Sequence, residues 1–370
     1  MKSILLLTHD TSLSGAPKSI LLVFEQLVKK GINLTTLAIT GGGELEERFQ
    51  KISNNYYRLD TIPKNKVYSF ASRLKRKLFG TPILSAYESF IDGVSATEFD
   101  FIYCNTIVSL QLGLILKEKT HCKLILHVHE LKTVIDEFCP LLKDYDAWID
   151  VYIVPSELNK KCLVENYTIP PNKIHVIRET SDFKGIVSRT KFSDSTINVL
   201  MCGGAYWRKG DDLFVLIANA ILKKDKRFRF HWVGHLSNER KRVNEADITK
   251  LGIKDFVHFI DETKNPLHWF LQSDLFMLTS REDPFPLAAI EAGMIGLPIF
   301  CFDQATGIAE VIDTSCVIPY LDIEQMSERI LSVVQNDLHF AALSTENKML
   351  FSTYTPEHIS SDIMHLIQVL

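Results

Sequence analysis

Two carboxylates with seven residues between them, Asp283 and Glu291, are the residues of this sequence best suited to chemistry. They lie in the stretch Thr279–Gly293, directly after the apolar run Leu275–Leu278, which is typical of a buried parallel strand. At this spacing both acids can project toward one crevice and hold hydroxyl groups there. The alternative is that Asp283 only caps a helix and Glu291 is an ordinary surface residue.

The residues between the two acids predict a change from strand to helix. Pro284 and Pro286 end the strand, and Pro286 fits the first turn of a helix, where a missing N–H costs nothing. Residues 287–291 include strong helix formers. A helix that begins just past the carboxyl end of a strand offers free amides and a positive dipole end to an anion. We therefore expect a phosphate on these amides, next to hydroxyl groups on the carboxylates.

A second segment with chemical potential is the loop Gly203–Gly210, which follows the predicted strand at residues 197–202. Its glycines let the backbone approach a pyrophosphate, and Arg208 and Lys209 can neutralise one. An Arg-Lys pair at a helix start is often surface charge only. The acids downstream favour the functional interpretation.

The stretch around the two acids resembles the E-x7-E element of the retaining GT-B glycosyltransferases, glycosyltransferase family 4. Asp283 stands in place of the first Glu, Glu291 corresponds to the second, and Pro284–Pro286 replaces the usual Gly-Phe-Gly. The resemblance implies that the first acid and the following backbone contact the sugar and phosphates of a donor, while the second acid holds ribose hydroxyls. By this resemblance the donor contacts here are Asp283, Phe285, Pro286, Leu287 and Glu291.

The resemblance extends over nearly the whole chain. Lys209–Gly210 corresponds to the Lys-Gly of the phosphate loop, whereas Gly204 replaces its Arg, so that Arg208 is expected to supply that charge. Gly15 corresponds to a Gly-rich turn after the first strand, and His129 to a sugar-facing histidine. The catalytic residues implied in this way are His129, Asp283 and Lys209.

Strand and helix patterns alternate from end to end and predict an α/β fold with two doubly wound halves. The helix predicted at residues 20–30 is ended by Gly31. The resemblance implies the GT-B arrangement, two Rossmann-like domains facing each other across a cleft. We expect an acceptor-side domain at residues 1–180, a nucleotide-sugar-binding domain at 181–355, and a last helix at 356–370 that returns to the first domain.

Composition excludes several other classes of protein. The chain has 370 residues, 46% of them hydrophobic and 23% charged, as expected of a globular protein. Its seven cysteines are scattered without a C-x-x-C, which favours reduced thiols in a cytosol over disulfides or a zinc site. A net charge of −4 gives no nucleic-acid footprint. No apolar run reaches the length of a membrane span, and residues 1–7 are interpreted as a first strand, not a signal sequence.

Two further charged segments call for interpretation. Residues 63–80 contain Arg73, Lys75, Arg76 and Lys77, which could form a basic amphipathic helix on the inner face of the plasma membrane or simply a solvated helix face. Residues 144–146 have the D-x-D spacing of metal-dependent transferases, but they lie in a predicted helix and are interpreted as surface charge. We expect neither a metal nor another cofactor.

Taken with these patterns, the resemblance implies a cytoplasmic retaining glycosyltransferase. It would move a sugar from a nucleotide diphosphate sugar to a glycan, lipid-linked or other acceptor in polysaccharide or glycoconjugate biosynthesis. The alternative is a non-catalytic nucleotide-sugar-binding subunit with the same fold. A nicotinamide-dependent dehydrogenase is disfavoured because the chain lacks G-x-G-x-x-G after its first strand.

Overall fold

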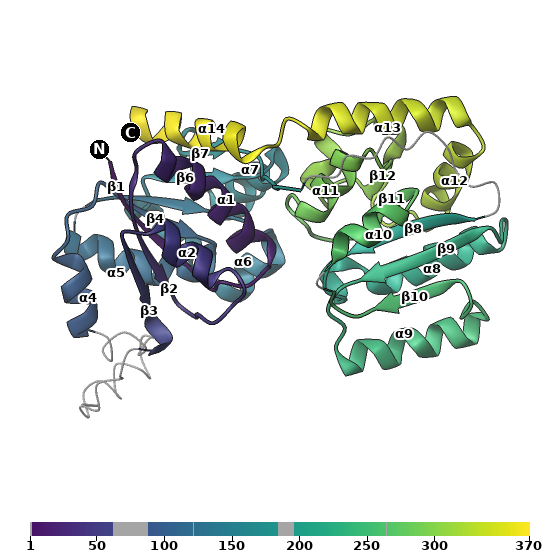
Figure 1. Cartoon of the computed structure of the whole chain (residues 1–370), viewed down its shortest axis with the longest axis horizontal. Helices are drawn as coiled ribbons and strands as arrows, with labels where there is room; N and C mark the ends of the chain where they lie inside the picture. Colours follow the sequence, from purple (N-terminus) through teal and green to yellow (C-terminus); the bar gives the residue numbers. More distant parts are fainter. Residues whose placement is uncertain (1, 62–87, 121, 184–195, 264) are drawn as a thin grey trace. The chain divides into compact units, whose positions relative to one another are not determined.

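The computed structural model describes residues 2–61, 88–120, 122–183, 196–263 and 265–370 (Figure 1). The chain divides into two compact units. Unit 1 comprises residues 1–154, 160–177 and 360–370, and unit 2 comprises residues 155–159 and 178–359. The basic segment predicted at 63–80 falls within 62–87 and so lies outside the described residues.

Unit 1 is built on a seven-stranded sheet in the order β3-β2-β1-β4-β5-β6-β7, with every recorded strand pair parallel. Its strands are β1 (Ser3–Thr8), β2 (Asn33–Ala38), β3 (Asn55–Arg58), β4 (Phe101–Asn105), β5 (Lys123–His127), β6 (Val151–Val154) and β7 (Ile174–Val176). Runs such as Ile4–Leu7 are fully buried, as expected for a parallel sheet covered on both faces. Strand order reverses between β1 and β4, which is where open α/β sheets bind ligands.

Helices connect these strands (Figure 1). They are α1 (Gly15–Lys29), α2 (Glu46–Ile52), α4 (Glu88–Ser95), α5 (Leu110–Thr120), α6 (Lys132–Phe138), α7 (Glu157–Tyr167) and α14 (Pro356–Val369), of which α7 and α14 begin in unit 2 and end in unit 1. The C-terminal helix is attached to unit 1 by Lys30, whose ammonium donates to the hydroxyls of Ser360 and Ser361 at 3.0 and 2.9 Å.

Unit 2 repeats the same plan with a six-stranded sheet in the order β10-β9-β8-β11-β12-β13, again with parallel pairs. Its strands are β8 (Ile197–Cys202), β9 (Phe228–Val233), β10 (Val257–Ile260), β11 (Leu275–Leu278), β12 (Ile299–Phe302) and β13 (Val317–Ile318). Its helices are α8 (Asp211–Leu222), α9 (Asn238–Leu251), α10 (Pro266–Gln272), α11 (Leu287–Ile295), α12 (Ile323–Val334) and α13 (Asp337–Phe351). The reversal here falls between β8 and β11.

An aromatic cluster fills the core of unit 2 between α8 and the sheet. The ring of Phe214 meets Phe230, Trp232 and Phe259 edge-to-face, with centroids 5.3 to 6.2 Å apart. Such edge-to-face pairs add to the energy of burial itself. The indole N–H of Trp232 donates to the carbonyl of Gly203 at 2.8 Å, which ties this core to the loop that leaves β8.

The predicted fold class is confirmed, and one predicted helix start is wrong. The first helix begins at Gly15, five residues before the predicted Ile20, because Pro17 is tolerated in a first turn instead of delaying the helix. Pro286 is the N-cap of α11, with Leu287 as the first helical residue, so the proline does not lie in the first turn. Among the described residues, no helix combines the length and apolar character that a membrane crossing requires.

Gly293 allows α11 to pack closely against α13. A Cβ added there would overlap the buried ring of Phe351, at the packing of α11 against α13. We expect Gly293→Ala to lower the free energy of unfolding by about 1–3 kcal/mol through overpacking. The matched control is Gly93→Ala in α4, where a Cβ meets nothing within 4 Å and the substitution should raise stability by up to about 1 kcal/mol. Urea unfolding followed by circular dichroism measures both, and equal effects would contradict the packing argument.

Candidate functional site

The loops that leave β8 and β11 are joined at the strand reversal of unit 2. The amide of Arg281 donates to the carbonyl of Arg208 at 2.8 Å, and the hydroxyl of Thr279 donates to the carbonyl of Lys209 at 3.1 Å. Gly210 has a φ of +73°, and a Cβ there would overlap the carbonyl of Thr279. Only glycine fits this position, because the backbone is both left-handed and in close contact.

Three predicted residues, Lys209, Arg208 and Asp283, come together in this junction. The ammonium of Lys209 bonds the carboxylate of Asp283, and the Arg208 guanidinium lies 3.6 Å from it. The hydroxyl of Ser280 also donates to Asp283 at 3.1 Å. The side chains of Lys209 and Asp283 are only 12% and 7% exposed, so this ion pair is largely withdrawn from water. Within this group the two cations Lys209 and Arg208 flank the single carboxylate of Asp283.

Arg208 is held rigidly in this cluster. Its guanidinium donates to the carbonyl of Glu282 at 2.6 Å and lies over the ring of Tyr206, 5.5 Å from the centroid. Burial lowers the pKa of Arg208, but the neighbouring Asp283 raises it above its ordinary value. The guanidinium therefore stays charged although it is only 25% exposed.

Sequence reasoning missed Arg281, which fixes the rest of the β11 loop. Its guanidinium makes two hydrogen bonds of 2.8 Å to the carboxylate of Asp212 and a third of 2.8 Å to the carbonyl of Trp207. A fork-to-fork pair of this kind is geometrically specific. In the sequence, Arg281 is only one more charged residue beside Glu282. Its partner Asp212 lies 69 residues away, so the pair could not be inferred from local sequence.

The turn into α11 brings a helix N-terminus next to this cluster. Pro286 is the N-cap with φ −66° and ψ 131°, and no side chain caps the helix there. The first amides of the helix, beginning at Leu287, are therefore oriented as in an anion site. The predicted residue Phe285 is 3% exposed and packs against Tyr354, with Arg178 over its ring at 5.1 Å. Its side chain is thus part of the core, and only its backbone remains for a ligand.

Glu291 lies within α11 and is only 6% exposed. One of its carboxylate oxygens accepts a hydrogen bond of 3.0 Å from the hydroxyl of Ser181. Ser181 comes from the segment that leaves β7, and its neighbour Thr180 is anchored to the carbonyl of Tyr354 at 2.8 Å. A buried acid that bonds a hydroxyl is not the surface Glu of the alternative interpretation. Ser181 was missed because it lies 110 residues away in an unremarkable polar stretch.

In unit 1 the predicted residue His129 lies just past the end of β5, at the same edge of the sheet as the end of β4. Its Nε2 is 2.8 Å from Oδ1 of Asn105, whose side-chain N–H₂ donates to the carbonyl of Ala16 at 3.2 Å. Because the amide nitrogen of Asn105 is committed to Ala16, Oδ1 faces the histidine and Nε2 of His129 is the donor. Gly15, the residue before Ala16, is the first residue of α1 and so lies at this edge too.

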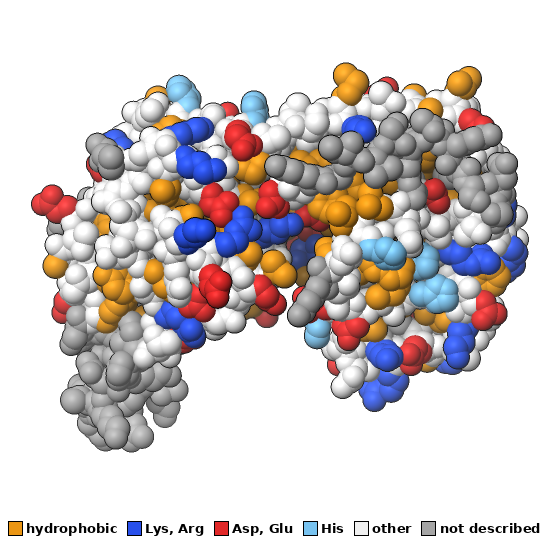
Figure 2. All heavy atoms as spheres, viewed as in Figure 1, with side chains coloured by type: hydrophobic (Ala, Val, Ile, Leu, Met, Phe, Trp, Pro, Cys, Tyr) orange, Lys and Arg blue, Asp and Glu red, His pale blue; other side chains and the backbone are white. Residues whose placement is uncertain are grey.

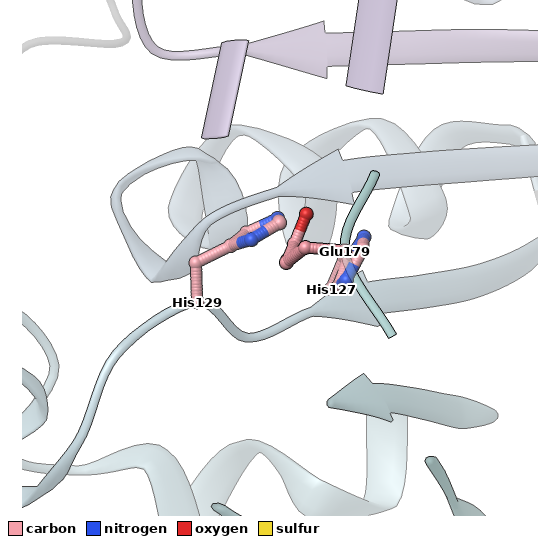
Figure 3. Close-up of side chains that lie close together, drawn as sticks. All are labelled: His127, His129 and Glu179. Atoms are coloured by element: carbon pink, nitrogen blue, oxygen red, sulfur yellow. The ribbon is translucent and has the colours of Figure 1, made fainter. Parts of the chain in front are cut away.

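The rings of His127 and His129 lie against each other, with centroids 3.9 Å apart and planes tilted by 34° (Figure 3). Nδ1 of the buried His127 is 2.8 Å from the hydroxyl of Tyr103, on the neighbouring strand β4. Each histidine is thus oriented by a β4 residue, Asn105 for His129 and Tyr103 for His127, that sequence reasoning did not assign to the site. Glu179, the third side chain labelled in Figure 3, belongs to unit 2.

Backbone strain marks the same edge of unit 1. Thr106, the residue after β4, has a φ of +79°, which is rare for a β-branched residue. Its hydroxyl is 3.4 Å from Nδ1 of His9, and the other ring nitrogen of His9 is 3.3 Å from Asp10. Burial raises the pKa of Asp10, but hydrogen bonds from His9 and Ser12 outweigh it and bring the value to about 2. Strain of this kind is typical of functional sites.

The acids with D-x-D spacing, Asp144 and Asp146, lie in a short helix, and Asp146 bonds neighbouring side chains. This is the 3₁₀ helix Leu142–Trp148, which precedes β6 in the chain. The carboxylate of Asp146 accepts from Lys173 at 3.2 Å and from the hydroxyl of Tyr152 at 3.1 Å. After burial, this carboxylate is the largest cause that raises the pKa of Tyr152.

Comparison with known families divides the chain as its two units do. Residues 13–179 match the family described as Glycosyltransferase Family 4, and residues 196–336 match the family described as Glycosyl transferases group 1. Together the two matches include most of the residues described above.

Individual relatives match over part of their length. An uncharacterized glycosyltransferase of Haemophilus influenzae is 25% identical over 44% of this chain and 46% of its own length. The amylovoran biosynthesis glycosyltransferase AmsD of Erwinia amylovora is 23% identical over 56% of this chain and 59% of its own. The chain thus spans about half the length of these curated relatives.

The fold is shared with a solved structure over its full length. Alr3699/HepE of Anabaena, crystallised in complex with UDP and glucose, superposes with a TM-score of 0.81 at 15% identity, covering 100% of both chains. At this identity the likeness concerns the fold alone.

Proposed function

Because the chain belongs to the GT-B glycosyltransferases, with one family match for each unit, we propose that it transfers a sugar from a nucleoside diphosphate sugar to a glycan or lipid-linked acceptor with retention of anomeric configuration. The observation that carries this proposal is the buried pair Lys209–Asp283 beside Arg208, at the strand reversal of unit 2. The Erwinia relative, named for amylovoran biosynthesis, supports a role in polysaccharide or glycoconjugate biosynthesis.

The two cations suit the diphosphate of the donor. Lys209, Arg208 and the first amides of α11 present positive charge and hydrogen-bond donors from two segments of unit 2, the loop after β8 and the start of α11. Negative charge grows on the diphosphate as the bond to the sugar breaks. The Lys209 ammonium can then shift its hydrogen bonds from Asp283 toward the departing phosphate, which stabilises the transition state more than the ground state.

Asp283 and Glu291 are assigned to hydroxyl groups. Released from Lys209, the Asp283 carboxylate accepts from a hydroxyl of the transferred sugar, with Ser280 keeping it in place. Glu291, already bonded to the Ser181 hydroxyl, accepts from the ribose. On unit 1, His129 is assigned to a hydroxyl of the transferred sugar, with Asn105 fixing its ring.

The proposed chemistry is a same-face displacement. The acceptor oxygen forms its bond to the anomeric carbon on the face from which the diphosphate leaves, and a phosphate oxygen takes the acceptor's proton. No carboxylate of this cluster is assigned as a covalent nucleophile, because Asp283 is held between Lys209, Arg208 and Ser280.

The second candidate is a non-catalytic nucleotide-sugar-binding subunit. It is favoured by Pro286, which lacks the amide that a glycine would offer to a phosphate. The two functions share a binding site and differ in turnover.

Turnover decides between them. We expect the purified protein to hydrolyse or transfer from at least one member of a panel of nucleotide sugars, with the product anomer read by NMR. Lys209→Ala should lower turnover by about 100-fold or more, as loss of a transition-state donor does, while donor affinity changes less. Binding without turnover would leave the non-catalytic subunit. If the Michaelis constant for the donor rises in Lys209→Ala while turnover is unchanged, Lys209 does not stabilise the departing diphosphate.

Glu291→Ala should weaken binding of the nucleoside diphosphate by about tenfold or more, since charge-assisted hydrogen bonds are worth about 1.5–3 kcal/mol. Calorimetry with the diphosphate and its 2′-deoxy counterpart should show the preference for ribose shrinking in the variant. The matched control is Ser181→Ala, which removes a hydroxyl that donates to Glu291 but no assigned ligand contact. An equal loss in both variants would make the role of Glu291 structural.

Turnover should survive excess EDTA, because Lys209, Arg208 and the start of α11 already supply the positive charge that a divalent cation would provide. Asp146→Ala serves as the companion variant. It should leave turnover unchanged but lower the free energy of unfolding by about 2 kcal/mol, because Tyr152 and Lys173 lose a charged partner. Activity that EDTA abolishes and Mn²⁺ or Mg²⁺ restores would refute the assignment of the diphosphate to these cations.

A further inference from the structure

Two histidines face each other across neighbouring strands of unit 2, apart from the residues assigned above. His231 of β9 and His258 of β10 are direct partners in the parallel register, so both side chains project from the same face of the sheet. Their rings lie 5.6 Å apart, centroid to centroid, and 25° from parallel. Figure 2 shows histidine side chains gathered on this face of unit 2, over β9, β10 and α10.

Helix α10 provides one wall of this group. The ring of Trp269 lies 5.3 Å from that of His231, and His268 packs edge-on against Trp269 at 5.7 Å. His258 is exposed, whereas His231 is half-buried between His258 and the indole. The pair is therefore open to solvent on the His258 side and backed by an aromatic ring.

The surroundings of His231 disfavour its protonated form. Burial lowers its pKa to about 4, and the neighbouring His258 and Arg229 act in the same direction. Arg229 itself is engaged with the carbonyls of Lys226 and Phe228 at 2.9 and 2.8 Å. Nδ1 of His231 is buried without a hydrogen-bond partner. Because no partner fixes the position of its proton, the ring can carry it on Nδ1 and present Nε2 as a ligand.

We propose that His231 and His258 together bind a divalent transition-metal ion through one imidazole nitrogen each. Metal–nitrogen bonds of about 2 Å place two ligand nitrogens at most about 4 Å apart, which side chains on strands about 4.8 Å apart reach by rotation alone. Imidazole nitrogens select Cu²⁺, Ni²⁺ or Zn²⁺, whereas Mg²⁺ and Ca²⁺ need oxygen ligands. Water completes the coordination on the exposed side.

Ni²⁺ titration of the untagged protein tests this site. We expect saturable binding in calorimetry together with quenching of the part of the tryptophan fluorescence that Trp269 supplies. His258→Gln should weaken this binding by about 100-fold, because a two-point attachment becomes a single one. The variant is chosen because His258 is exposed, so its loss should not disturb folding. Trp269→Phe should keep the calorimetric site and lose the associated quenching.

The matched control is His235→Gln, which removes an exposed histidine just past the end of β9 that takes no part in the pair. It should bind Ni²⁺ as the parent does. Equal affinity in the parent and His258→Gln, or quenching that persists in Trp269→Phe at the same ion concentration, would refute the site. Glutamine keeps the polarity and approximate size of the histidine, so a loss seen with it reports on the imidazole.

Discussion

The ion pair between Lys209 and Asp283 holds together the parts of unit 2 on which the proposed chemistry depends. It joins the loop after β8 to the loop after β11, and both side chains are nearly buried. Taking two charges out of water is costly, so a pair of this kind persists only where further hydrogen bonds satisfy it. Ser280 and Arg208 supply those interactions. Removing one member would leave the other charged and buried. When the bond between Lys209 and Asp283 breaks, the donor diphosphate must therefore become the new anionic partner of Lys209.

Both units place their polar residues where the strand order reverses. In unit 2 the residues come from the ends of β8 and β11, and in unit 1 from the ends of β1, β4 and β5. The left-handed backbone at Gly210 and the strained φ at Thr106 occur at these two positions. A parallel sheet buries both of its faces, so the carboxyl edges of its strands are where polar side chains can gather without cost to the core.

Much of the arrangement of strands, loops and helices could be predicted from local sequence, because each of these elements has a characteristic pattern of neighbouring residues. The stretch around Asp283 and Glu291 is the clearest case: the strand and the following helix are both present, although Pro286 is the N-cap of that helix and not part of its first turn. The first helix was predicted five residues short because a proline near a helix start can delay it or belong to its first turn. Partners distant along the chain leave no such pattern. Ser181 beside Glu291 and His231 opposite His258 depend on tertiary placement and strand register.

At the proposed phosphate site, Pro286 lacks a backbone N–H, so nearby side chains must supply more of the hydrogen bonds and positive charge. Pro286 fixes the start of α11 but has no N–H to offer, and Gly204 carries no charge. Arg208 has one N–H on the Glu282 carbonyl, its guanidinium lies over the ring of Tyr206, and Asp283 is 3.6 Å away. Anchored in this way, the arginine loses little further side-chain freedom when a diphosphate arrives. The positive charge of the site therefore rests on rigid side chains of the β8 loop more than on backbone amides of α11.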